Sequence, residues 1–318
     1  MIVQRQVALT GATGFIGSAL LPRLVEGGWS VRALYRRRPG RVPVPQRGVD
    51  WVEGDLGDER SLRALVTGAD AIVHCAGTVR GATRAGFERI NADGTRRLVH
   101  VAASASAAPR FLLMSSLAAR MPQLSAYAAS KRDGELAVEA APDNVRWTVL
   151  RPPAVYGPGE KELRPLLRWV ARGIAPLPAG STGRFSLLYV DDLATAVLRW
   201  LEADSGYGRT FEVDDGHAGG YDWDTVLAVA GRVLRGGGNV RRLPIPLAVL
   251  KLAAAANLAA ARLVGYDPML TPGKVREITH RDWLCDSHDF VGAVGWQPAV
   301  GLEDGLARAY GKRKQRTQ

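Results

Sequence analysis

Hydrophobic and polar positions follow a repeating pattern over the first half of the chain. Short apolar runs, such as the one that begins at Val7, alternate with stretches in which apolar residues recur at helical spacing. Alternating strands and helices of this kind indicate a parallel sheet with right-handed crossover connections. Strands are predicted at residues 7–10, 29–35, 49–56, 69–77, 110–116 and 147–151, and helices at about 18–24, 61–67, 92–104 and 124–135.

The pattern changes after Arg151. A rigid Pro/Gly-rich loop leaves the sheet, a helix is predicted near residues 162–172, and the chain is mainly helical from Trp223 onward. Further strands are predicted at 185–190 and 210–213, with a helix at 193–202 that Asp191 and Asp192 would cap.

These elements predict an α/β fold with a Rossmann-type doubly wound parallel sheet and a smaller, mostly helical C-terminal substrate domain. The second domain is expected to close over the carboxyl edge of the sheet, with the catalytic cleft between the two. The expected division is 1–155 with 185–215 for the domain built on the sheet, and 156–184 with 216–318 for the substrate-binding domain.

Three glycines follow the first predicted strand and open the first helix. Gly11 would let the chain turn, Gly14 would let the backbone approach a pyrophosphate, and Gly17 would let the helix pack closely on the sheet. Free N–H groups at the helix N-terminus would then face the phosphates. Because this spacing lies between a strand and a helix, it predicts a dinucleotide site.

The second strand ends in three arginines, Arg36, Arg37 and Arg38, rather than in an acidic residue. An acid at this point binds the ribose 2′-hydroxyl of NAD, whereas an arginine accommodates the 2′-phosphate of NADP. We therefore predict NADP as cofactor, held by Arg36 with Arg37 behind it, and NAD stays open. The alternative is a solvated loop that happens to be rich in arginine.

Candidate catalytic residues follow the fifth strand. Ser115 and Ser116 lie at its carboxyl end, where ligands bind in parallel sheets, and Tyr127 and Lys131 lie one turn apart on the next helix. A lysine ammonium beside a phenol favours the phenolate and lowers its pKa, which suits acid–base work. His74 ends the fourth strand with no acidic neighbour in sequence, and a structural role is expected for it.

Composition and charge narrow the class of protein. The chain has 318 residues and a net charge of +11, but its basic residues are scattered, so no nucleic-acid partner is expected. Cys75 and Cys285 form no disulfide framework or metal site, and the start shows no long apolar stretch. We therefore expect no signal peptide, no metal and a cytoplasmic location.

Residues 247–264 form a long apolar stretch rich in alanine and leucine, interrupted by Lys251, Asn257 and Arg262. Because these polar residues interrupt it, we expect no transmembrane span. The stretch is predicted to be a helix of the substrate domain that supplies apolar walls above the cleft. Contact of residues 247–264 with a membrane surface is left open, as is a homodimer.

Taken together, the motifs resemble the extended short-chain dehydrogenase/reductase family, also called the NAD-dependent epimerase/dehydratase family. The resemblance implies that Tyr127 donates or accepts the proton, Lys131 also binds the nicotinamide ribose, and Ser116, with Ser115 as the alternative, orients the substrate oxygen. It further implies a cofactor site built from Gly11, Thr13, Gly14, Phe15, Ile16, Gly17, Arg36, Asp55, Leu56, Ala76, Gly77, Tyr127, Lys131 and Pro153.

Two positions depart from the sugar-nucleotide members of this family. Ala154 stands where they carry an asparagine that meets the pyrophosphate, and Phe185 stands where they tend to carry an arginine. Both features resemble the branch of dihydroflavonol reductases and 3β-hydroxysteroid dehydrogenases.

We therefore expect an oxidoreductase that interconverts an alcohol and a carbonyl on a small molecule with a sizeable apolar body. One alternative is a nucleotide-sugar epimerase or dehydratase, in which Arg184, Arg241 or Arg276 would hold the phosphates. The other alternative is a dinucleotide-binding regulator or assembly subunit without chemistry.

Overall fold

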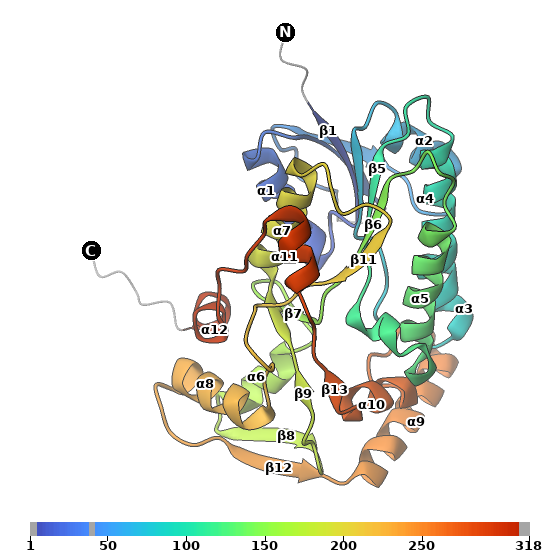
Figure 1. Ribbon diagram of the computed structural model, residues 1–318. Helices are drawn as coiled ribbons and strands as arrows, with labels where there is room; N and C mark the ends of the chain where they lie inside the picture. Colours follow the sequence, from blue (N-terminus) through green and yellow to red (C-terminus); the bar gives the residue numbers. More distant parts are fainter. Residues whose placement is uncertain (1–4, 38–41, 312–318) are drawn as a thin grey trace.

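The computed structural model describes residues 5–37 and 42–311, and its centre is a seven-stranded parallel sheet (Figure 1). The strand order is β11-β6-β5-β4-β1-β2-β3, so the chain reverses direction across the sheet between β1 and β4. This reversal opens a crevice at the carboxyl ends of the strands. The strands are β1 (Gln6–Thr10), β2 (Ser30–Tyr35), β3 (Val49–Glu53), β4 (Ala71–His74), β5 (Arg110–Met114), β6 (Trp147–Arg151) and β11 (Arg209–Glu212).

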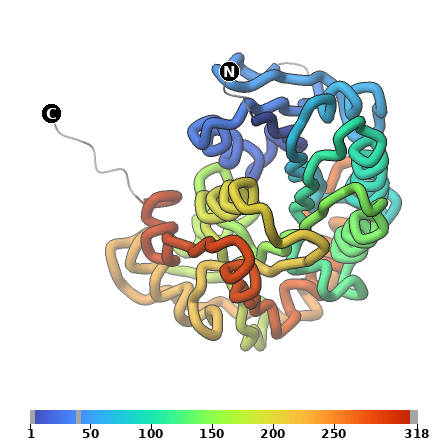
Figure 2. The backbone as a smooth tube through the Cα atoms, turned by 45° about the horizontal axis from the view of Figure 1, so that its top comes forward, coloured from blue at the N-terminus to red at the C-terminus, as the bar shows by residue number. Residues whose placement is uncertain are grey.

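Helices cover both faces of the sheet, as the two views in Figures 1 and 2 agree. One face carries α1 (Phe15–Glu26), α7 (Val190–Glu202) and α11 (His288–Val294), and the core beneath them includes Leu24, Trp200 and Trp296. The other face carries α2 (Glu59–Val66), α4 (Asp93–Ala103) and α5 (Ala126–Glu139). These helices contribute Leu62, Leu98 and Val138 to the core on that face. The predicted doubly wound α/β fold is therefore confirmed.

A third hydrophobic core lies below the sheet in Figure 1, around Tyr156, Ala175 and Leu227. Three short parallel strand pairs frame it, β7 with β10, β8 with β12, and β9 with β13. Its elements are β7 (Ala154–Tyr156), α6 (Arg164–Val170), β8 (Ile174–Pro178), β9 (Arg184–Phe185), β10 (Leu187–Tyr189), α8 (Trp223–Arg235), β12 (Arg241–Ile245), β13 (Asp282–Trp283) and α12 (Leu302–Tyr310).

The division of the chain into two domains stays a prediction. Phe290 and Trp296, which belong to the second group of residues, pack in the first core beneath α7. Short helical segments lie in the connections after β4 and β5: α3 (Arg84–Phe87), a π-helical turn at Glu88–Ala92, and two 3₁₀ turns at Leu117–Arg120 and Pro122–Leu124.

Helix α7 begins earlier than expected. It starts at Val190, and Tyr189 occupies the N-cap position without a side-chain hydrogen bond, so capping by Asp191 and Asp192 was wrong. Asp192 instead accepts hydrogen bonds from the backbone N–H groups of Ala299 and Val300, at 3.1 and 2.8 Å. Its carboxylate is therefore committed to the C-terminal segment and cannot cap its own helix.

Helix α9 (Leu247–Val264) forms where a helix was predicted, and its role as a wall of the cleft stays a prediction. Only 11% of its residues are buried, and it packs on α10 (Pro272–Thr279). By length and by its mean hydropathy of 1.7, it is the one helix of the described residues that could cross a membrane.

Candidate active site

The glycines after β1 form a tight turn that leaves no room for side chains. Gly11 has a φ of +73°, and a Cβ there would lie 2.7 Å from the backbone nitrogen of Ala76. A Cβ on Gly17 would lie 2.1 Å from the carbonyl oxygen of Gly11, because α1 packs directly against the turn. Both positions therefore require glycine, as predicted for a loop that brings backbone close to a ligand.

The N-terminus of α1 is open for an anion. Gly14 is the N-cap residue and provides no side-chain hydrogen bond, and Thr13 and Gly14 are exposed beside Phe15 and Ile16. The first N–H groups of a helix lack partners within the helix and carry partial positive charge. This end of α1 thus fits a pyrophosphate, and the residues present fit a dinucleotide cofactor.

The ends of β2 and β3 lie side by side at the same edge. Arg36 is exposed, while Arg37 lies 3.8 Å from the carboxylate of Glu53 in an exposed ion pair. Arg38 lies outside the described residues.

Asp55 is exposed and accepts a hydrogen bond from the backbone N–H of Gly57 at 2.6 Å, and Leu56 packs against Gly94. The exposed Arg36 and Asp55 thus follow neighbouring strands at the same edge of the sheet, and contact of Arg36 with a cofactor stays a prediction.

The loop after β4 contains Ala76 and Gly77. The Ala76 N–H donates to the Thr10 hydroxyl at 3.1 Å, and a Cβ on Gly77 would lie 3.9 Å from Nζ of Lys131. The glycine turn, this loop and the candidate catalytic lysine are thus neighbours.

His74 is fully buried between the hydroxyls of Thr10 and Thr95, at 2.6 and 3.0 Å, and burial lowers its pKa to about 3. It holds the strand end together, as a structural role requires.

Ser116 and Tyr127 lie beside one another at the carboxyl end of β5. Ser125 caps α5 by accepting a hydrogen bond from the Ala128 N–H at 2.9 Å, which fixes the helix turn that carries Tyr127. Burial raises the pKa of Tyr127 to about 12; the hydrogen bond with Ser116 acts to lower this pKa and the charge of Glu277 acts to raise it. The Phe87 ring stands edge-on to the Tyr127 ring, with centroids 6.1 Å apart.

Ser115 points the other way. Its hydroxyl donates to the carboxylate of Glu135 at 2.5 Å, inside the protein. The two adjacent serines therefore have different surroundings, and Ser116 is the one beside the phenol.

Lys131 is buried one turn beyond Tyr127, and its Nζ donates to the carbonyl oxygen of Met114 at 2.7 Å. Burial lowers the pKa of Lys131 to about 8, although Glu135 and Cys75 oppose this shift. The expected lowering of the Tyr127 pKa by Lys131 is not found here. Loss of solvent around the phenol prevails, and the lysine is directed at a carbonyl.

A buried ion-pair network lies behind these residues. Glu135 is fully buried and accepts hydrogen bonds from both Arg151, at 2.8 and 2.5 Å, and Arg132, at 3.0 Å. It links α5 to the ends of β5 and β6, which hold Ser115 and Arg151. Sequence reasoning missed this residue because its signal, an acid four positions after Lys131, is ordinary on a helix surface.

Asn91 is a second residue that sequence reasoning missed. It lies in the π-helical turn and is 3% exposed. Its side chain accepts from the N–H of Thr78 and donates to the Thr78 carbonyl and the Ser130 hydroxyl, at 2.8, 3.0 and 2.9 Å. It thus joins the loop after β4 to α5. Pro153 lies in the short connection between β6 and β7.

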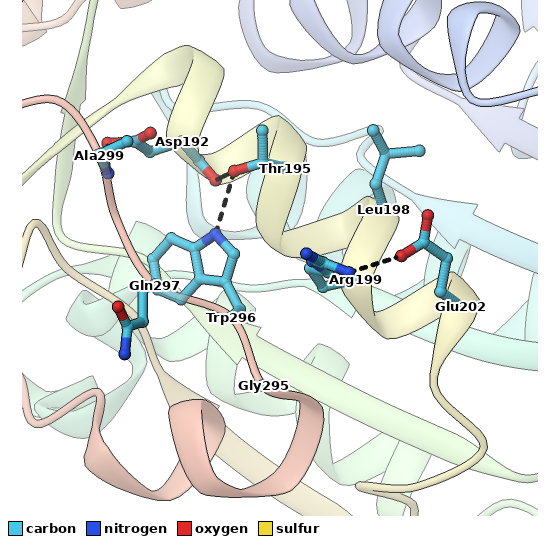
Figure 3. Close-up of a pocket in the computed structure, with 9 residues that line it drawn as sticks. All are labelled: Asp192, Thr195, Leu198, Arg199, Glu202, Gly295, Trp296, Gln297 and Ala299. Carbon is cyan, nitrogen blue, oxygen red and sulfur yellow. Dashed lines mark hydrogen bonds and ion pairs between the residues drawn. The ribbon is translucent and has the colours of Figure 1, made fainter.

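An open hollow of about 560 Å³ lies elsewhere, between α7 and the segment that follows α11 (Figure 3). Several of its polar groups are already engaged, because Trp296 Nε1 donates to Thr195 at 3.0 Å and Arg199 pairs with Glu202 at 3.1 Å. Since none of the candidate catalytic side chains lines it, this hollow is not the active site.

Comparison with known proteins places this site in context. Residues 7–213 match the NAD dependent epimerase/dehydratase family. The chain is 38% identical over 300 residues to the ceramide reductase of Caulobacter vibrioides, covering 94% of this chain and 92% of that protein. It is 25% identical to a decarboxylating sterol-4-alpha-carboxylate 3-dehydrogenase of Candida albicans, covering 95% of each chain.

Among solved structures, the fold is similar to UDP-glucuronic acid 4-epimerase from Bacillus cereus in complex with NAD. The TM-score is 0.73 at 16% identity, with 96% of this chain and 97% of that chain covered. The family match spans the glycine turn, Ser116, Tyr127 and Lys131. The chain therefore belongs to the NAD dependent epimerase/dehydratase family and is a nicotinamide-dinucleotide-dependent enzyme of the extended short-chain dehydrogenase/reductase type.

Proposed function

We propose that the protein interconverts a ketone and a secondary alcohol on a lipid-like small molecule, with Tyr127 as the acid–base residue. The observation that carries this proposal is the convergence of Ser116, Tyr127 and Lys131 beside the glycine turn. A proton donor, a hydrogen-bonding hydroxyl and a cation then surround one substrate oxygen.

The nicotinamide of the bound cofactor supplies the hydride in reduction and accepts it in oxidation. In reduction, the carbonyl carbon gains the hydride while Tyr127 donates its proton to the oxygen. A phenol with a pKa of about 12 is protonated at neutral pH, which suits this donor role. Ser116 donates a hydrogen bond to the same oxygen, and the Tyr127 phenolate regains a proton from water.

Lys131 supports both cofactor and proton transfer in this scheme. Its Nζ lies near Gly77 in the loop after β4, so it can donate to a ribose hydroxyl of the cofactor. Its positive charge, one helix turn away, favours the phenolate that forms when Tyr127 gives up its proton, an effect that burial of the phenol outweighs in this structure.

NADP is the proposed cofactor in preference to NAD. Arg36 is exposed at the end of β2, whereas Arg37 already faces Glu53. A guanidinium at this position forms a charge-assisted pair with a 2′-phosphate, whereas an uncharged 2′-hydroxyl offers it only an ordinary hydrogen bond.

An apolar substrate is favoured over a nucleotide sugar. Ala154 offers no side-chain hydrogen bond, and Phe185 packs on Trp223 with ring centroids 5.0 Å apart. Arg184 donates to the backbone carbonyls of Gly219 and Gly220, at 2.6 and 2.9 Å. Arg276 donates from Nε to the backbone carbonyl of Leu124 at 2.7 Å, so both guanidinium groups are partly engaged within the protein. The 38% identity to a protein named ceramide reductase supports a long-chain amide-bearing ketone as substrate.

The test measures NADPH oxidation with a long-chain 3-ketoceramide and, separately, epimer formation from UDP-glucose. We expect turnover of the ketone alone. Tyr127→Phe should bind NADPH normally and lose about 100-fold or more in kcat, since general acid catalysis contributes on this order. Tyr207→Phe, which removes a partly buried phenol that contacts Asp204 and Arg110 at the start of β5, is the control and should keep full activity. Full activity in Tyr127→Phe, or epimer without ketone reduction, would refute the proposal.

A further inference from the structure

Helix α9 exposes an apolar face that the described part of the chain does not cover. Within this helix, whose residues are all described, only Ala254 and Ala261 are buried. Leu252, Leu263 and Val264 are 72%, 87% and 78% exposed. Single exposed leucines are ordinary, but a whole helix face of this kind marks an interaction surface.

The helix is nevertheless anchored to the protein along its other face. Asn257 donates to the carbonyl of Leu270 at 2.8 Å, and the Tyr266 hydroxyl contacts the Asn257 side-chain oxygen at 2.5 Å. Ala254 and Ala261 have small side chains that let α9 lie close to α10. The outward direction of the leucines is therefore fixed by packing and polar contacts.

The exposed residues are arranged around the helix in a definite order. At 3.6 residues per turn, Val249, Leu252 and Leu263 point within about 60° of one another. Lys251 and Arg262, both exposed, point within about 20° of each other along one edge of that apolar face. An apolar face edged by basic residues is typical of helices that lie in a membrane interface.

The charge around α9 favours an anionic partner. From Thr225 to Tyr266 the sequence contains no Asp or Glu. Arg232 and Arg242 pair with Glu303 and Asp224, at 2.9 and 2.6 Å. Among residues 5–37 and 42–311, no ion pair involves Arg241, Lys251 or Arg262.

A second copy of the chain fits this surface less well. A symmetric pair through α9 brings the same cations from both copies together without a carboxylate between them. Lipid phosphates, in contrast, neutralise Lys251 and Arg262 while the acyl region receives the leucines.

We propose that α9 docks along the surface of an anionic lipid bilayer. In this arrangement Leu252 and Leu263 enter the boundary between headgroups and acyl chains, and Lys251 and Arg262 extend to the phosphates. The helix lies in the interface and does not cross the bilayer, because these two cations stand within its length.

Docking by α9 would bring the candidate active site to the membrane. The carbonyl of Pro268, just after α9, accepts from the N–H of Gly81 in the loop that follows β4, at 3.3 Å. Glu277 of α10 contacts Ser125, the cap of the helix that carries Tyr127. Figure 1 shows α9 and α10 side by side below α5. The inference goes beyond the proposed function and does not depend on it.

Flotation with vesicles tests the proposal. Purified protein is floated with vesicles of phosphatidylcholine alone and with vesicles that also contain phosphatidylglycerol, with neither cofactor nor substrate present. We expect binding to the anionic vesicles to exceed binding to the neutral ones by about tenfold, and to weaken as salt is raised. The double variant Lys251→Gln with Arg262→Gln should lose this preference, and Leu252→Asn with Leu263→Asn should lose binding to both.

The matched control replaces two exposed valines far from α9 in the sequence. Val42→Asn with Val44→Asn, at positions 66% and 80% exposed, should float like the unchanged protein. The proposal fails if the unchanged protein does not float, if the valine control loses binding equally, or if size-exclusion chromatography shows a dimer that the leucine variant dissociates. Because no ketone is present, loss of reductase activity and loss of docking are separate results.

Discussion

At the scale of single residues, burial decides what the candidate catalytic groups can do. Tyr127 and Lys131 are one turn apart, yet Lys131 donates its hydrogen bond to the carbonyl of Met114, and burial moves the two pKa values apart, to about 12 for Tyr127 and about 8 for Lys131. Burial disfavours the charged form of each group. The protein therefore starts with a protonated phenol and an ammonium that is easily lost.

The lowered pKa of Lys131 predicts a pH dependence. Its cation is present below about pH 8 and is lost as pH rises through that value, so stabilisation of the forming Tyr127 phenolate is lost in the same direction. We expect kcat/KM for ketone reduction to fall above about pH 8, which a pH–rate profile measures. Lys131→Arg, where it retains activity, should move the fall to higher pH. A kcat/KM that is constant across this range would contradict the prediction.

Arg36 gives a prediction on cofactor choice. Replacing its guanidinium with a carboxylate in Arg36→Asp removes the partner of a 2′-phosphate and adds an acceptor for a 2′-hydroxyl. Calorimetric titration should then show NADPH affinity reduced by about tenfold or more and NADH affinity maintained, since a charge-assisted contact has this magnitude. Arg37→Asp, at an arginine already facing Glu53, is the comparison. An unchanged NADPH preference in Arg36→Asp would exclude this role.

At the scale of elements, α10 secures the start of the catalytic helix. Glu277 is buried and accepts hydrogen bonds from Ser125, the N-cap of α5, and from Lys274 at 2.8 Å. The backbone carbonyl of Glu277 accepts a hydrogen bond from the indole N–H of Trp283 at 2.9 Å. A turn of α10 thereby holds the residue that begins α5, two positions before Tyr127.

Glu277→Ala should consequently affect both stability and turnover. Ser125 loses a buried partner, and we expect denaturant unfolding to show about 1–3 kcal/mol lower stability, with a reduced kcat and an unchanged cofactor affinity. Glu303→Ala, which removes an exposed partner of Arg232, should change little. Equal behaviour of the two variants would show that α10 does not position α5.

The elements also show what a sequence can predict. The seven sheet strands were all anticipated, because each has apolar residues in a short run or in alternation with polar ones and most are bounded by turn residues. The start of α7 was not, because Asp192 bonds residues 299 and 300, far away in the chain. The Glu135 network and the Asn91 contacts likewise depend on which strands and helices meet, information that local periodicity does not contain.

At the scale of the whole molecule, the candidate site joins parts of the chain that fold around different cores. The glycine turn and Ser116 belong to the sheet, whereas Glu277 and Pro268 come from the last fifth of the chain and contact α5 and the loop after β4. The roles of the cofactor and catalytic residues stay predictions, while their proximity in space follows from the fold.

The late position of β11 in the chain affects how the protein acquires its structure during synthesis. This strand pairs with β6, yet residues 152–208 separate the two, and Phe290 and Trp296 reach the same core only near the end. A nascent chain that has emerged as far as Arg151 has six of the seven strands, but α7 and α11 do not yet cover one face. Completion of the nucleotide-binding half must therefore wait for almost the entire polypeptide, which extends the time that its apolar surface is open to chaperones.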